Sequence, residues 1–107
     1  MSRFILAVVL ASFGGTVQAE PFVDLSRFPG YAVIMKATIA GWYDDKGNQG
    51  EDFQGCDFGR TIVFDNNKIL HCTGYSYEYG YKPVAVILSN GSSYKMIVTS
   101  TVFDMAR

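Results

Sequence analysis

The sequence predicts a small all-β domain, an antiparallel meander of about five strands curled into a barrel or a partly open barrel. Short runs of β-branched and aromatic residues recur between polar turns that contain Gly or Asn. No stretch of the chain shows the hydrophobic period of a helix. A sheet of this size must curl to cover its own core, because the chain offers no second layer.

Polar turns separate the predicted strands. YAVIMKATIAGWY ends in DDKGNQGED, which reads as a solvated hairpin tip. RTIVFD and KILHCTGY meet at Asn66-Asn67, and asparagine tolerates the positive φ of a tight hairpin. NGSS joins the last pair of runs. The five predicted strands cover 31–43, 60–65, 68–75, 84–89 and 94–103.

A register for the last hairpin follows from its apolar residues. If Leu88 lies opposite Tyr94, then Val86 faces Met96 and one face of the hairpin is apolar. This register implies a loop with an odd number of residues. The predicted core consists of Ile34, Ile62, Phe64, Leu70, Val86, Leu88, Met96 and Val98.

The first 19 residues have the layout of a secretory signal peptide. A basic start at Arg3 precedes an apolar run at 4–13, and small residues at Val17 and Ala19 precede the expected cleavage. Residues 1–19 are therefore assigned to the signal peptide and residues 20–107 to one all-β domain. The mature chain begins with EPFVDLSRFPG, which predicts an irregular arm or a single helical turn held by aromatic burial.

The two cysteines, Cys56 and Cys72, are expected to form a disulfide in an oxidising compartment. A straight hairpin with Asp65 opposite Lys68 would place them far apart, whereas a disulfide needs Cα atoms within about 7 Å. The chain must therefore bend in GCDFG, where Gly55 and Gly59 permit it. We expect this bend to fold onto the hairpin.

Charge and hydropathy exclude several classes of partner. Removal of Arg3 leaves eight basic residues against ten acidic ones, a net charge of about −2 that is scattered along the chain. Without a basic stripe, nucleic acid is not an expected partner. The mature chain has no apolar run long enough to span a membrane, because Lys36 interrupts the longest one.

The residues that most often carry catalysis or bind metals are sparse. His71 is the only histidine, and no serine lies in a nucleophile context such as GxSxG, so His71 reads as a structural or surface residue. The acidic stretch 44–52 lacks the ligand spacing of an EF-hand loop, and an irregular calcium site is the weaker interpretation. No metal, cofactor or catalytic residue is predicted.

Four tyrosines occupy every second position of GYSYEYGYKP, namely Tyr75, Tyr77, Tyr79 and Tyr81. In an extended strand, side chains at alternate positions share one face. Two interpretations follow. The rings complete the core with their hydroxyls at its rim, or they form an exposed aromatic platform together with Trp42 and Tyr43.

The run GCDFGR, followed by a short hairpin and GYSYEYGYKPVAVIL, resembles a set of small secreted proteobacterial proteins without an assigned activity. The resemblance spans most of the mature chain. It implies a periplasmic or secreted location and supplies no catalytic residues.

These observations predict an exported, non-enzymatic binding or accessory module of the bacterial cell envelope, with its contact surface on the tyrosine-rich face. The candidate partners are carbohydrate, an extended peptide or an envelope protein. One alternative is an inhibitor or partner of an envelope enzyme that acts through DDKGNQGED or NGSS. Another is a small hydrolase that uses His71. The sequence does not indicate an oligomeric state.

Overall fold

The computed structural model describes residues 21–107, and the predicted signal peptide lies outside them. The described chain is all-β apart from one short 3₁₀ turn, η2. The elements are η2 (Leu25–Arg27), β1 (Ala32–Asp44), β2 (Gln49–Gly50), β3 (Asp52–Phe53), β4 (Arg60–Phe64), β5 (Ile69–Cys72), β6 (Gly80–Tyr81), β7 (Val84–Ser89), β8 (Tyr94–Val98) and β9 (Thr101–Ala106).

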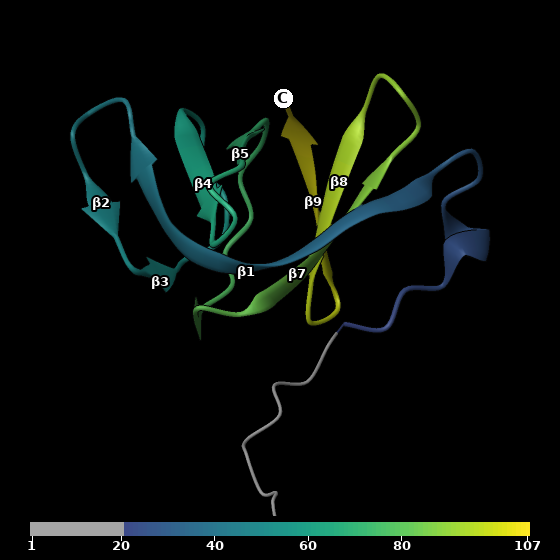
Figure 1. The fold of residues 1–107 in the computed structure, drawn as a ribbon. Helices are drawn as coiled ribbons and strands as arrows, with labels where there is room; N and C mark the ends of the chain where they lie inside the picture. The colour runs from purple at the N-terminus through teal and green to yellow at the C-terminus, as the bar shows by residue number, and fades with distance from the viewer. Residues whose placement is uncertain (1–20) are drawn as a thin grey trace, which may run out of the picture.

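Six antiparallel strands form a closed barrel, which confirms the predicted fold class (Figure 1). Their order around the barrel is β1, β4, β5, β9, β8 and β7, and β7 pairs again with β1. The order departs from a simple meander between β5 and β7, where residues 73–83 carry the chain back to β1. This return gives β7, β1, β4 and β5 the Greek-key order. The four tyrosines lie on this long connection.

Strand β1 pairs with two strands, β7 and β4, because it is long and irregular. Residues 32–38 pair with β7, whereas residues 39–44 pair with β4. The register shifts between Val33 and Met35 and again between Ile39 and Gly41. Such bulges bend a strand and increase its twist, which lets β1 sweep across the whole barrel (Figure 1).

The interior of the barrel is apolar. Fully buried side chains include Ile39, Ile62, Phe64 and Met96, and Phe53 packs edge-on against Phe103 with ring centroids 5.5 Å apart. Ile34 is a wrong prediction, because its side chain is 55% exposed. It lies at the first β1 bulge, where the alternation of faces is interrupted.

A second apolar cluster lies on the outside of the barrel. Val86, Leu88 and Ile97 form it, and Phe28 and Tyr31 of the N-terminal arm pack against it. The predicted arm with one helical turn is therefore confirmed, and it covers what would be an exposed sheet face. Further partly buried contacts to the cluster come from Val23 and Val102.

The register predicted for the last hairpin is wrong by one residue. Leu88 lies opposite Lys95 rather than Tyr94, and the loop of residues 90–93 has four residues. In that loop Asn90 accepts hydrogen bonds from the backbone N–H groups of Ser92 and Ser93. A shift of one residue exchanges the two faces of a strand. Val86 and Leu88 therefore belong to the outer cluster, not to the barrel interior.

The predicted strand 94–103 is two strands. The chain turns at Thr99 and Ser100, and β9 then pairs back along β8 with Val98 opposite Thr101. Thr99 has a φ of 57°, which a β-branched residue rarely adopts. This turn supplies the sixth strand of the barrel, and β9 closes the gap beside β5.

The β4–β5 hairpin turns at Asn66 and Asn67 as predicted, with Asn67 at a φ of 68°. Its register also differs by one residue, because Thr61 lies opposite His71 rather than Cys72. The Phe64 N–H donates to the Lys68 carbonyl, so the loop has three residues instead of two. Leu70 and Cys72 consequently point into the barrel.

Candidate functional site

The tyrosine ladder, which we define as Tyr75, Tyr77, Tyr79 and Tyr81, belongs to the connection between β5 and β7. Most of this connection is one strand of a two-stranded ribbon outside the barrel sheet. Residues 52–56 form one strand of this ribbon and residues 76–81 form the other. Strands β3 and β6 pair at one end, and Cys56 and Ser76 form a bridge at the other. The ribbon holds the connection 73–83 extended without placing it in the barrel.

The predicted disulfide and the predicted bend are both present. Cys56 and Cys72 are linked, with their Cα atoms 5.5 Å apart. Gly55 and Gly59 adopt positive φ values of 81° and 82° on either side of the turn. The Arg60 N–H donates to the Asp57 carbonyl and closes that turn. The disulfide therefore ties the ribbon to β5 of the barrel.

The rings of the ladder point outward. The exposed fractions of the four tyrosines lie between 60% and 68%, so the interpretation that they complete the core is wrong. The residues between them are half-buried and face the molecule. These alternate positions are Ser76, Glu78, Gly80 and Lys82.

The inward-facing residues anchor the ribbon. The Thr101 hydroxyl at the start of β9 donates a hydrogen bond to the Glu78 carboxylate. The Lys82 ammonium donates to the Ala40 carbonyl of β1 at 3.0 Å and lies 3.8 Å from the Glu51 carboxylate. Because these polar side chains attach the segment to the barrel, its fixed position does not depend on the tyrosine rings.

Polar groups flank one end of the ladder. Asp52 lies directly opposite Tyr81 in the ribbon, so both side chains share the outer face. The Gln54 amide donates to the Asp52 carboxylate at 3.1 Å. The exposed surface therefore combines a row of aromatic rings with a carboxylate and an amide at its edge.

Trp42 does not join this surface. Its side chain is only 8% exposed, and the Arg60 guanidinium lies 4.2 Å from the centre of its ring. The same guanidinium donates to the Gly55 carbonyl at 3.2 Å. The prediction of Trp42 as an exposed contact residue is wrong, since it faces inward beside Ile62, its neighbour on β4. Its stacking with Arg60 instead stabilises the bend in GCDFG, because Arg60 also donates to Gly55.

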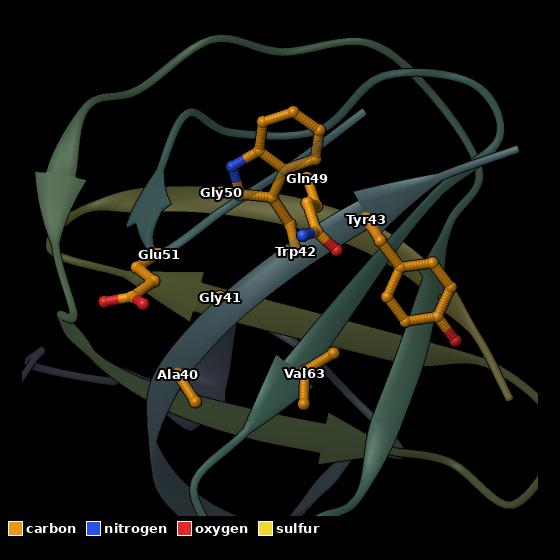
Figure 2. A pocket seen from close by; sticks show the side chains of 8 residues that line it. All are labelled: Ala40, Gly41, Trp42, Tyr43, Gln49, Gly50, Glu51 and Val63. Atoms are coloured by element: carbon orange, nitrogen blue, oxygen red, sulfur yellow. The ribbon is translucent and has the colours of Figure 1, made fainter. Parts of the chain in front are cut away.

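Tyr43, the next residue, is partly exposed and lines a shallow cleft of about 410 Å³. Figure 2 shows Tyr43 and Glu51 at opposite sides of this cleft, with Ala40 on β1 and Val63 on β4. The buried Trp42 also lines the cleft. Glu51 also lies near Lys82, whose ammonium is 5.6 Å from the Tyr81 ring. The cleft and the ladder therefore meet at the Glu51–Lys82 pair.

His71 lies on the outer face of β5 and is exposed. Its Nδ1 atom lies 2.9 Å from the Thr61 hydroxyl, which is the only polar side-chain contact found for it among residues 21–107. That hydroxyl belongs to a buried residue. Within residues 21–107, His71 lines neither the cleft beside Tyr43 nor the cavity beside Leu70.

Within the acidic stretch 44–52, residues 45–48 form the predicted hairpin tip between β1 and β2. Both Asp44 carboxylate oxygens accept hydrogen bonds from Asn48, and one also accepts from the Lys46 N–H. Burial raises the pKa of Asp44, but these hydrogen bonds outweigh it and leave the pKa below its ordinary value. Within residues 21–107 no group of three or more His, Cys, Asp or Glu side chains could hold a metal ion.

No helix in residues 21–107 is long and apolar enough to cross a membrane. Comparison of the chain with protein-family models, curated proteins and solved structures gives no match.

Proposed function

We propose that this protein is an exported, non-enzymatic binding module of the bacterial cell envelope whose contact surface is the tyrosine ladder. The observation that carries the proposal is the exposure of all four rings on a segment that other side chains hold in place. Tyrosines in binding surfaces offer large contact area at a low cost in conformational entropy. The disulfide is compatible with an oxidising compartment outside the cytoplasm.

The partner class that the ladder favours is an extended peptide segment of an envelope protein. Alternate residues of an extended chain recur every ~6.6 Å, and a peptide laid along the ladder would have the same period. The side chains of the peptide would then have the same spacing as the four tyrosine rings along the whole ladder. The carboxylate of Asp52 and the amide of Gln54 would fix one end by hydrogen bonding.

The test is the double substitution Tyr77→Ser/Tyr79→Ser. Both rings are exposed, so the free energy of unfolding is expected to change by about 0.5 kcal/mol or less at each site. Binding to envelope proteins, measured by quantitative pull-down with the purified domain as bait, should fall about tenfold or more. The partner segment is then identified by cross-linking and measured as a synthetic peptide.

A matched control is Phe22→Ser/Leu25→Ser, which removes two exposed apolar side chains from the N-terminal arm. This variant should bind like the unaltered protein. Equal capture by the tyrosine variant and the unaltered protein would refute the proposal. Unfolding of the tyrosine variant would also refute it, since the rings would then support the fold.

Inhibition of an envelope enzyme through a loop is a second candidate. The hydrogen bonds to Asp44 organise the 45–48 tip, and a rigid loop loses little entropy on entering a cleft. If the protein is such an inhibitor, replacement of Asp45, Lys46 and Asn48 with alanine would abolish capture of its partner. If the tyrosine ladder is the contact surface, the same replacement would leave capture unchanged.

A further inference from the structure

One open end of the barrel contains a cavity of about 320 Å³ that the ladder does not reach. Inward-facing side chains of four barrel strands form its apolar lining: Met35 of β1, Leu70 of β5, Ile87 of β7 and Tyr94 of β8. These residues belong to or pack against the main core, so the cavity is the unfilled mouth of the barrel interior. Barrel mouths are common sites for small ligands.

The rim of this mouth mixes apolar and hydrogen-bond-donating groups. Ile34 and Ile69 are exposed there, at 55% and 40%, although both are large aliphatic residues. Asn66 and Lys68, from the β4–β5 turn, also line it. No Asp or Glu side chain is among the lining residues. Arg107 lines the mouth too, so the charged side chains among the lining residues, Lys68 and Arg107, are both cationic.

The size of the cavity limits what can enter. An apolar cavity of about 150 Å³ holds one benzene ring, so the mouth has room for a short hydrocarbon chain or a single ring. The barrel interior is otherwise filled by fully buried side chains, among them Ile39, Phe64 and Met96. A ligand must therefore leave its other end at the rim, beside Lys68.

We propose that the barrel mouth binds a small amphipathic anion, with its short apolar chain among Met35, Leu70 and Ile87 and its carboxylate beside Lys68. Desolvation of the chain and of the exposed rim isoleucines supplies the attraction. The ammonium of Lys68 selects the charge of the head group. This site is separate from the tyrosine ladder and does not depend on its function.

The probe is octanoate, titrated below its micelle concentration into protein with ¹³C-labelled Ile, Leu, Val and Met methyl groups. Saturable chemical-shift changes are expected for the methyl groups of Met35, Leu70 and Ile87. No such changes are expected for Val98 or Ile62, which lie elsewhere in the core. Octyltrimethylammonium, which has the same chain and the opposite charge, should bind at least fivefold more weakly.

Two kinds of variant separately test the charge of Lys68 and the volume of the cavity. Lys68→Glu should weaken octanoate binding about fivefold, whereas Lys46→Glu makes the same charge change at a distant hairpin tip and should leave it unaltered. Met35→Phe narrows the cavity and should abolish binding. If that variant does not fold, Ile34→Asn at the exposed rim replaces it, with a loss of severalfold expected.

The proposal is overturned by shifts that do not saturate or that spread over the whole core. It is also overturned if both head-group charges bind equally, or if Lys68→Glu binds octanoate as tightly as Lys46→Glu. The Tyr77→Ser/Tyr79→Ser variant should retain octanoate binding, so failure of this site and failure of the ladder give different results.

Discussion

At Gly55 the backbones of the two ribbon strands lie close together. A Cβ atom there would lie 2.2 Å from the Ser76 carbonyl oxygen and 2.7 Å from the Glu78 nitrogen. Both atoms belong to the backbone and cannot rotate away. The positive φ of 81° excludes most other residues as well. Only glycine therefore lets the bend carry the tyrosine segment against it.

The substitution Gly55→Ala is expected to lower the free energy of unfolding by about 3 kcal/mol, because backbone strain and a backbone clash add. Urea unfolding measures the change. Gly47→Ala is the matched control, since Gly47 has a φ of 90° but no atom within 4 Å of the added Cβ. Its cost should be only about 1 kcal/mol. Similar costs for the two variants would show that the close approach is not as tight as described.

Asp44 predicts a pH effect of known sign. Burial raises its pKa, but the hydrogen bonds from Asn48 and Lys46 prevail and hold the folded-state pKa below 3.8. The charged form therefore stabilises the folded loop above pH 3.8, and this contribution is lost as the pH falls through the lower folded value. Asp44→Asn should flatten the stability profile in that acidic range. An NMR titration that finds the Asp44 pKa at or above 3.8 contradicts the prediction.

At the scale of elements, the N-terminal arm covers an apolar sheet face. Leu88 is fully buried although it points away from the barrel interior, because the arm packs over its cluster. Phe28→Ala should lower the free energy of unfolding by about 1–2 kcal/mol, less than for a fully buried phenylalanine. Binding of a dye that reports exposed apolar surface should increase. Phe22→Ala, in the same arm but 87% exposed, should change stability by no more than about 0.5 kcal/mol.

The same cluster explains why one part of the fold could be predicted and another could not. The run VAVILS is apolar on both faces, so its composition predicts a strand but not which residues point inward. The register then depends on the NGSS loop, whose four-residue form is set by hydrogen bonds to Asn90. The turn at Thr99–Ser100 could not be predicted for a related reason, because Thr99 has a positive φ that threonine rarely adopts.

In the candidate site, too, one feature could be predicted from the sequence and another could not. The period of two in GYSYEYGYKP indicates that the tyrosines share a face, but it does not indicate which face is buried. That choice depends on distant partners, namely Thr101 for Glu78 and Ala40 for Lys82. The burial of Trp42 could not be predicted in the same way, because Arg60, which stacks on its ring, lies on another strand.

For the whole molecule, the disulfide joins the ribbon to the barrel across a sequence separation of 16 residues. The substitution Cys56→Ala/Cys72→Ala is expected to lower the free energy of unfolding by about 3 kcal/mol. Hydrogen exchange should become faster first at the Ser76 amide, while the amides of Met96 and Val98 in the barrel should keep most of their protection. Uniform loss of protection would mean that ribbon and barrel unfold as one unit.

Closure of the barrel depends on strands that are far apart in the sequence. Strand β1 pairs with β7, and β5 has its second neighbour only when β9 is present. During synthesis, the growing polypeptide consequently lacks a complete set of partners until residues near 106 have left the ribosome. The chain would therefore stay unfolded until late in its synthesis. An unfolded chain can pass through a translocation channel, whereas a folded barrel cannot.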